Sequence, residues 1–390
     1  MSRTLALVLP VLVLTAAGCG ASKDDSSGGA SAPVTVEKTR VETVASSPSS
    51  SGASGGGAFD ARAIYARDAR GVVTVVSLYS AGDSLSGRGA EGSGFVIDGA
   101  GEIATNAHVV TVGQGSSIHE VAKVYVRFPD QNQVEARIVG FDANEDVALL
   151  KVDPSGLTLR PLSLGNSATV AVGAPVAAIG SPFGEEGSLS TGIVSATDRT
   201  IDSLTRFQIS GALQTDAAIN HGNSGGPLVD SGGSVLGINS QINSSSGDNS
   251  GVGFAIPIDS VKRSLDQLRS KGHVDYAYLG VSTSALYPQL AKRLGLPVDH
   301  GAIIAQVVAG GPADKAGLRE GHGSIRFQGA SVPQGADVVT AVDGKPVRLD
   351  DDLGRLITPY APGHVVKLSI LRDGKPRTVS VKLGQRPATG

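Results

Sequence analysis

Short apolar segments, separated by clusters of Gly, Asp and Asn, run through the chain from residue 72 to residue 257. The segment VAKVYVRF at 121–128 alternates apolar and polar positions, and the segment at 72–78 is rich in β-branched residues. Both patterns are typical of β-strands. Two sets of short strands of similar length predict two β-barrels rather than a helical fold. The further strands are predicted at residues 92–97, 133–141, 147–152, 169–180, 189–197, 212–218, 227–240 and 253–257.

Helical patterns frame this strand-rich region at both ends. The segment FDARAIYARDAR at 59–70 predicts a short helix before the first strand. Apolar residues at helical spacing begin again at Ile258, and Gly272 supplies a stop signal for that helix. We therefore expect the first ordered domain to occupy residues 59–272.

A different module begins near Tyr276. It contains a helical stretch at 350–357, and Asp343-Gly344 and Asp373-Gly374 are dipeptides that favour tight hairpin turns. This mixture predicts a second, smaller α+β domain over residues 273–390. Its strands are predicted at residues 301–308, 337–342, 364–371 and 378–383.

The first residues read as a secretory signal. The apolar run at 5–17 is too short to cross a bilayer, so residues 1–18 are predicted to be a signal peptide. The ending Ala16-Ala17-Gly18 followed by Cys19 resembles the lipobox of bacterial lipoproteins, in which the cysteine is lipidated and becomes the mature N-terminus. Because Ala16 stands where Leu or Val is usual, ordinary cleavage to a secreted protein is the alternative.

A tether is predicted to follow, over residues 19–58. Between Gly20 and Ala58, 25 of 39 residues are Gly, Ser, Ala or Pro. Such a composition cannot bury enough apolar surface to offset the entropy of ordering. With Cys19 lipidated, this segment would connect the folded domains to the outer face of the cell membrane.

Charge and cysteine content exclude several functions. Lys and Arg number 33 against 36 Asp and Glu, and this balance removes the electrostatic argument for nucleic-acid binding. A single cysteine, Cys19, excludes an internal disulfide and a zinc site built from several cysteines. The histidines are scattered without ligand spacing, so neither a metal nor another cofactor is expected.

The heptapeptide GNSGGPL at 222–228 is the most informative motif. It matches the G-x-S-x-G nucleophile elbow of α/β-hydrolases, but that elbow needs a helix directly after the serine. Here strand-like residues and a Gly-rich hairpin follow Ser224. The motif equally matches the nucleophile loop of trypsin-like serine proteases, where glycines permit a tight turn close to the substrate backbone. A Gly/Ser hairpin turn without a catalytic role is the third interpretation of this motif.

Two further residues favour the interpretation of Ser224 as the nucleophile of a serine protease. His108 follows a strand-like segment, and Asp146 precedes the apolar strand at 147–152. The chain order His108, Asp146, Ser224 is that of the chymotrypsin class. In that chemistry His108 takes the proton of the Ser224 hydroxyl, and Asp146 orients the imidazole and stabilises its charged form. The backbone N–H groups of Gly222 and Ser224 are placed in sequence to hold the oxyanion.

In these motifs, residues 59–390 resemble the HtrA/Deg family of serine proteases. The segments SGFVID (93–98), GSPFG (180–184), TGIVSA (191–196), QTDAAIN (214–220) and GFAIP (253–257) stand where that family has its loop and strand signatures. The resemblance implies a mainly β fold, in which a chymotrypsin-like double six-stranded barrel precedes a PDZ domain.

The resemblance also implies a function. It predicts an extracytoplasmic serine endopeptidase that degrades unfolded or misfolded proteins, with neutral His108 as base and activity rising through roughly pH 6 to 7.5. It further implies a homotrimer, with Phe59, Ile64 and Tyr65 as candidate contacts. The main alternative is a chaperone or peptide-binding scaffold with a latent triad, and an α/β-hydrolase esterase is a weaker one.

The family comparison extends to substrate specificity. Trypsin-like enzymes that select basic side chains carry an acid six residues before the nucleophile, and that position is Ala218 here. A small or medium aliphatic residue is therefore expected before the scissile bond. The predicted S1 pocket consists of Ala218, Ile219, Ile238, Asn239 and Ser240.

The C-terminal domain carries a binding motif of its own. The segment Tyr278-Leu279-Gly280-Val281 is similar to the carboxylate-binding loop of PDZ domains. A peptide C-terminus would be held by backbone N–H groups of this loop while the peptide adds to the sheet as a strand. The helical stretch at 350–357 would form the other wall, and residues 322–336 are expected to form a long loop.

Overall fold

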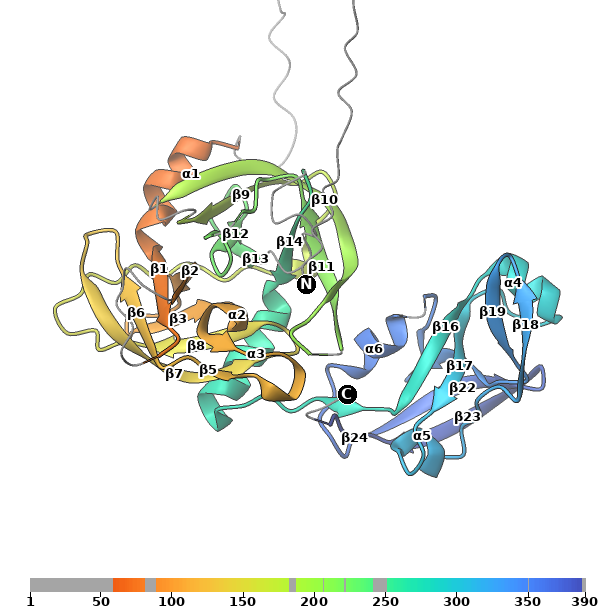
Figure 1. Cartoon of the computed structure of the whole chain (residues 1–390). Coiled ribbons are helices and arrows are strands. Elements are labelled where there is room, and N and C mark those ends of the chain that lie inside the picture. The colour runs from red at the N-terminus through yellow and green to blue at the C-terminus, as the bar shows by residue number, and fades with distance from the viewer. Residues whose placement is uncertain are drawn as a thin grey trace, which may run out of the picture. The chain divides into compact units, whose positions relative to one another are not determined.

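A computed structural model describes residues 59–80, 89–181, 187–205, 207–220, 222–240, 251–349 and 351–387 (Figure 1). Among these residues, antiparallel strands dominate, and the expected mainly β fold is confirmed. No helix in the described ranges is long and apolar enough to cross a membrane. The predicted signal peptide, Cys19 and the predicted tether lie outside the described residues.

Six antiparallel strands close the first barrel, in the order β1-β2-β3-β8-β7-β6. The alternation predicted at 121–128 is visible in β6, where Val124 and Val126 are buried and their neighbours are partly exposed. A separate apolar core, which includes Val75, Ile103 and Leu150, fills this barrel. The strands are β1 (Val72–Leu78), β2 (Gly89–Val96), β3 (Glu102–Thr105), β6 (Lys123–Arg127), β7 (Gln133–Asp142) and β8 (Val147–Lys151).

A second closed barrel has the order β10-β11-β14-β13-β12-β9. The strand predicted at 227–240 is a hairpin, because Gly233 takes the left-handed conformation between its two arms. The strand predicted at 169–180 begins only at Pro175, since the Asn166 side chain caps a 3-10 turn before it. The strands are β9 (Pro175–Gly180), β10 (Ser188–Asp202), β11 (Gln208–Thr215), β12 (Pro227–Val229), β13 (Val235–Ser240) and β14 (Gly253–Pro257).

Few helices accompany the two barrels. Helix α1 (Ala61–Asp68) begins at Asp60, whose carboxylate accepts two backbone N–H groups, and it buries Ile64 while Tyr65 stays exposed. Helix α3 (Ile258–Lys271) packs against β7 and β8 of one barrel and β13 and β14 of the other. Gly272 ends α3 in the left-handed conformation, as the sequence predicts. The remaining short elements are η1 (Ala69–Gly71), α2 (Ala107–Val110), β4 (Thr111–Val112), η2 (Gly115–Ser117), β5 (His119–Glu120) and η3 (Ser167–Thr169).

The C-terminal module is a β-sheet with short helices and its own core. Asp343-Gly344 and Asp373-Gly374 have positive φ at all four residues, as the predicted hairpin turns require. The loop expected at 322–336 instead contains the hairpin β18–β19, and helix α4 was missed. Its strands are β15 (Ala277–Tyr278), β16 (Val281–Leu286), β17 (Gly301–Val307), β18 (Gly323–Phe327), β19 (Ala330–Gln334), β20 (Val338–Val342), β21 (Lys345–Pro346), β22 (Val365–Arg372), β23 (Lys375–Lys382) and β24 (Gly384–Gln385). Its helices are α4 (Pro288–Leu294), α5 (Pro312–Lys315) and α6 (Asp352–Ile357).

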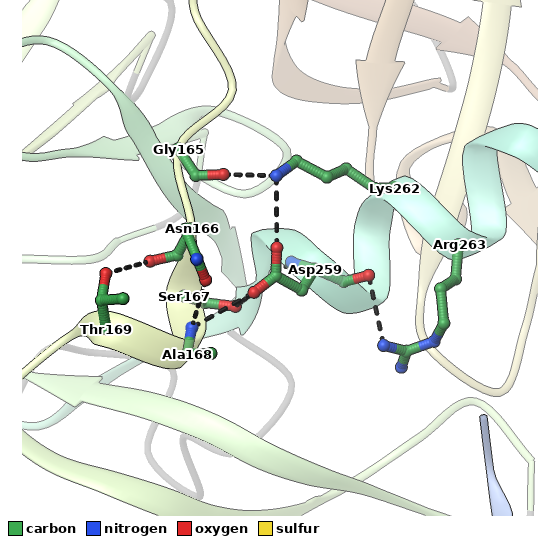
Figure 2. Close-up of polar contacts among 8 residues, drawn as sticks. All are labelled: Gly165, Asn166, Ser167, Ala168, Thr169, Asp259, Lys262 and Arg263. Carbon is green, nitrogen blue, oxygen red and sulfur yellow. Dashed lines mark hydrogen bonds and ion pairs between the residues drawn. The ribbon is translucent and has the colours of Figure 1, made fainter.

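The start of α3 is fastened to the segment that connects the two barrels (Figure 2). The Asp259 carboxylate accepts the Ser167 hydroxyl at 2.9 Å and the Ala168 N–H at 3.2 Å. Lys262 donates to the same carboxylate at 3.2 Å and also to the carbonyl of Gly165. Burial opposes ionisation, but these hydrogen bonds prevail and lower the pKa of Asp259. The carboxylate therefore connects the two barrels through α3.

Asp259→Asn should lower the free energy of unfolding by about 1 kcal/mol at pH 7, since it removes one charge-assisted set of partly solvent-screened bonds. Because the folded-state pKa is lowered, this stabilisation exists above the ordinary pKa of the carboxyl. It should vanish as the pH falls through the folded-state value. Urea unfolding at several pH values measures both effects. The control is Asp266→Asn on the same helix, where the side chain is 76% exposed and little change is expected.

Candidate active site

His108 and Asp146 form a hydrogen-bonded pair in the first barrel. The Nδ1 atom of His108 lies 2.8 Å from Oδ2 of Asp146, and the His108 backbone N–H donates to Oδ1 at 2.9 Å. Helix α2 carries His108 directly after β3, and Asp146 occupies the turn between β7 and β8 with a φ of 52°. The Asp146 side chain is fully buried, whereas that of His108 is 28% exposed. With Nδ1 engaged, Nε2 is the free ring nitrogen for proton transfer.

Two residues support Asp146 in ways that the sequence did not indicate. The Asn106 amide donates to the backbone carbonyl of Asp146 at 2.8 Å, which stabilises the strained turn. The Ser240 hydroxyl, from the second barrel, donates to Oδ2 of Asp146 at 3.3 Å. Sequence reasoning assigned Ser240 to the S1 pocket only. The carboxylate therefore collects donors from both barrels, which compensates for its burial.

Burial and Asp146 act in opposite directions on His108. Desolvation lowers the pKa of the imidazole, but the negative charge of Asp146 and its hydrogen bond raise it, and the net pKa is raised above 6.5. A raised pKa makes the imidazole a stronger base in its neutral form. This is the condition that a general base acting near neutral pH requires.

The loop that carries Ser224 is fixed against the first barrel. Ser93, on β2, donates its N–H to the carbonyl of Ser224 at 2.8 Å and its hydroxyl to the carbonyl of Gly222 at 2.5 Å. Gly225 has a φ of 89°, and a Cβ atom on it would lie 2.0 Å from the carbonyl oxygen of Ser93. Only glycine permits this approach, so the sequence motif has a structural reason.

The same loop presents a backbone donor. The carbonyl of Asn223 accepts the N–H of Gly226 at 2.9 Å, so the N–H of Ser224, across the same planar peptide, points to the opposite side. Gly222 is also in the left-handed region, with a φ of 93°. Within the described residues no hydrogen bond joins Ser224 to His108. In ligand-free enzymes, catalytic hydrogen bonds are often long or poorly aligned and tighten only when substrate binds.

The residues predicted to form the S1 pocket take different places. The carbonyl of Ala218 accepts the Ser190 hydroxyl at 2.8 Å, and Ile219 is buried against Gly253. Ile238 and Asn239 are fully buried. The backbone of Asn239 exchanges hydrogen bonds with Gly225 and Gly226, at 3.0 and 2.9 Å, and so supports the Ser224 loop.

The predicted carboxylate-binding loop lies between β15 and β16. The carbonyls of Leu279 and Gly280 accept the N–H groups of Ala313 and Val308, each at 2.9 Å. Because each peptide is planar and trans, the N–H groups of Gly280 and Val281 point away from those partners. Gly280 has a φ of 79°, so successive N–H groups can converge on one anion. A cavity of about 270 Å³ opens there.

The described residues contain no cluster of His, Cys, Asp and Glu side chains that could hold a metal ion. The arrangement at His108 and Asp146 offers proton transfer through an imidazole. The loop at Ser224 offers a hydroxyl and a backbone donor beside it.

Comparison with known families gives two matches along the chain. Residues 92–238 match the trypsin-like peptidase domain, and residues 277–383 match the PDZ domain. The first match contains His108, Asp146 and Ser224, and the second contains the loop at Tyr278–Val281.

Several curated proteins resemble this chain. A probable periplasmic serine endoprotease DegP-like from Pseudomonas fulva (strain 12-X) is 40% identical over 297 residues, which is 76% of this chain and 56% of that protein. A protein of the same name from Halomonas elongata is 43% identical over 296 residues, 76% of this chain and 56% of that protein. Protease Do-like 1, chloroplastic, from Arabidopsis thaliana is 40% identical over 301 residues, 76% of this chain and 64% of that protein. The chain thus spans little more than half the length of the first two.

Solved structures share the fold over a larger fraction of their length. The HtrA-type protease AlgW with tripeptide superimposes with a TM-score of 0.70 at 30% identity, covering 84% of this chain and 98% of that one. The serine endoprotease from Yersinia pestis superimposes with a TM-score of 0.60 at 27% identity, with the same coverage.

Asp146→Asn tests the electrostatics of the buried pair. Removing the charge leaves desolvation as the main influence on His108, so the pKa of its imidazole should fall below the ordinary value. The imidazole titration followed by NMR measures this. Asp130→Asn, on an exposed turn, is the matched control and should leave His108 unchanged. An imidazole pKa in Asp146→Asn at or above that of the unmodified protein would contradict the assignment.

Proposed function

Since the chain belongs to the HtrA/Deg family of trypsin-like serine proteases with a PDZ domain, we propose that it is a serine endopeptidase acting on unfolded or misfolded proteins. The observation that carries this proposal is the pair His108–Asp146 beside the fixed loop of Ser224. The protein relatives named above are described as periplasmic or chloroplastic proteases. An extracytoplasmic location is therefore proposed for this chain.

The proposed reaction is acyl transfer. Ser224 Oγ attacks the scissile carbonyl while Nε2 of His108 takes its proton and later gives it to the leaving amine. Asp146 keeps Nδ1 protonated and stabilises the imidazolium. The N–H groups of Gly222 and Ser224 would hold the oxyanion. Water then hydrolyses the ester with His108 again acting as base.

The proposed specificity is for a small or medium aliphatic residue before the scissile bond. The pocket would be formed by Ala218 and Ile219 on one side and by the 238–240 segment on the other. Ala218 is the partly exposed member of this set, and an apolar pocket without a charged partner favours an aliphatic side chain. Ser240 would then have a second task, since it also donates to Asp146.

The PDZ domain is proposed to bind peptide C-termini. The N–H groups of Gly280 and Val281 point away from their packing partners, both residues line the cavity described above, and a peptide would add as a strand beside β16. The structural relatives include HtrA-type proteases with a tripeptide and with a decapeptide.

Further proposals concern assembly and anchoring. Lipidation of Cys19 would attach the chain to the membrane, and a homotrimer is proposed with Tyr65 as a contact, because Tyr65 is 42% exposed. Ile64 is buried in the core and is therefore not proposed as a contact. Phe59 is partly buried against the same core.

Digestion of an unfolded protein such as casein tests the activity. Ser224→Ala should abolish cleavage, with a loss of at least about 10³-fold, since the nucleophile is removed. A variant ending at Gly272 shows whether the PDZ domain activates or restrains cleavage. Unchanged cleavage in Ser224→Ala would refute the proposal. No cleavage by any form, even with C-terminal peptides added, would favour a chaperone or scaffold with a latent triad.

The pH profile of kcat/KM gives an independent prediction. Only neutral His108 can accept the serine proton, and its pKa is raised by Asp146 against the effect of burial. Activity should therefore rise with pH, with a midpoint above the ordinary imidazole value of 6.5. A profile that stays flat from pH 5 to pH 8 would contradict the role of His108.

A further inference from the structure

Arg386, near the C-terminal end, lies beside the PDZ groove in an unusual environment. Its N–H donates to the carbonyl of Tyr276 at 2.9 Å, next to the pairing of β24 with β15. Its guanidinium carbon lies 4.4 Å from the ring centroid of Phe207 and 4.6 Å from that of Tyr276. Both distances are within the range of a cation–π contact. The cation is therefore held between two aromatic rings.

The charge of Arg386 is only partly compensated. Burial lowers the pKa of its guanidinium, and Nε is buried without a hydrogen-bond partner in the described part of the chain. The negative charges of Asp142 and of Glu145, when these acids are ionised, oppose that effect of burial on the pKa of Arg386. Within the same residues no hydrogen bond joins Arg386 to either acid. A guanidinium carries five donors, so it retains capacity for a carboxylate.

Arg386 also lines the cavity of about 270 Å³ at the carboxylate-binding loop. The loop residues 278–283 form one wall, Leu353 and Ile357 of α6 form another, and Phe207 and Arg386 complete it. Gly280 and Val281, whose N–H groups point away from Val308 and Ala313, line the same cavity. An incoming carboxylate would thus meet backbone donors and a half-buried cation in one cavity.

We propose that Arg386 binds a carboxylate of the peptide in this groove, and that this carboxylate competes with Glu145 and Asp142 for the same guanidinium. The inference rests on the proposed binding of peptide C-termini. It adds a recognition residue outside the loop motif. It also connects the groove electrostatically to the turn that precedes Asp146.

Glu145 is the group that would respond. It is buried, and its Oε2 atom has no hydrogen-bond partner among the described residues. Desolvation and the charge of Asp142 raise its pKa to about 8, while Arg263 and Arg386 lower it. A peptide carboxylate beside Arg386 would weaken the last effect, so the pKa of Glu145 should rise on binding. The charged and titratable groups around Glu145 are Asp142, Asp146, Arg263, Asp266, Lys271, Asp275, Tyr276, Tyr360 and Arg386.

Calorimetric titration with an N-acetylated, histidine-free peptide tests recognition. The full chain carries Ser224→Ala in every sample, so that the peptide stays intact. Arg386→Gln should weaken binding of the free-acid peptide about tenfold or more, since a charge-assisted bond is lost. Arg377→Gln, an exposed arginine of the same domain outside the cavity lining, removes the same charge and should have little effect.

Two peptide changes identify the carboxylate. The test peptide carries Glu as its penultimate residue. Amidation of the C-terminus removes the terminal carboxylate, and Gln in place of the penultimate Glu removes the side-chain carboxylate. One of these peptide changes should abolish the difference in affinity between the unmodified protein and Arg386→Gln. That change identifies the carboxylate that Arg386 binds. Arg386→Lys keeps the positive charge but loses the planar guanidinium, so it should bind the peptide with intermediate affinity. An intermediate affinity would show that the loss in Arg386→Gln is not caused by a folding defect.

The outcomes separate the two proposals. In one outcome, the free-acid peptide binds better than its amide and yet binds Arg386→Gln as tightly as it binds the unmodified protein. That result would overturn the role of Arg386 and leave the PDZ function standing. No peptide binding by the unmodified protein would remove the PDZ function itself.

Proton linkage tests the competition. Binding near pH 8 should be accompanied by uptake of a fraction of a proton, seen as a binding enthalpy that depends on the ionisation enthalpy of the buffer. Affinity should correspondingly increase as the pH falls from about 9 to about 7. Glu145→Gln should abolish both effects. Equal proton uptake in Glu145→Gln would refute the proposed competition.

Discussion

The burial of one carboxylate, that of Asp146, is the constraint on which the rest of the active site depends. A buried charge is stable only when nearby donors replace the water it has lost. Here the replacement comes from the backbone and ring of His108 in the first barrel and from Ser240 in the second. The two barrels must therefore dock correctly before the carboxylate is satisfied. The same docking, through the bonds from Ser93, fixes the Ser224 loop against β2 of the first barrel.

The turn that precedes Asp146 connects this constraint to the rest of the chain. One oxygen of Asp142 accepts the N–H groups of Asn144 and Glu145, at 3.1 and 3.3 Å, and so closes the turn. The other accepts the hydroxyls of Ser264, at 2.6 Å, and of Tyr276. Ser264 belongs to α3, and Tyr276 begins the C-terminal module. A displacement at either place would therefore act on the backbone next to the pair of His108 and Asp146.

Part of this arrangement was readable from the sequence, because local pattern and motif carried it. Period-two alternation predicted the strands, and the order His108, Asp146, Ser224 predicted a pair that the structure places in contact. The support for that pair could not be predicted. Ser240 and Ser93 act across the boundary between barrels, and no local pattern records which strand will lie opposite another. The hairpin β18–β19 was missed because its residues include Gly and Pro at positions that also suit a loop.

The two links to the C-terminal module differ in kind, and the difference bears on regulation. Each carboxylate oxygen of Asp142 already accepts two hydrogen bonds. This link can therefore pass a movement of Ser264 or Tyr276 to the turn, but it has no acceptor left for a further donor. The link between Glu145 and Arg386 is unsaturated, because each side chain keeps a buried polar atom without a partner in the described residues. The second link can respond to a new charge through the protonation of Glu145, whose pKa is raised to about 8. In the proposed function, two acids three residues apart would divide two tasks, because Asp142 fixes the turn next to Asp146 while Glu145 responds to a bound peptide.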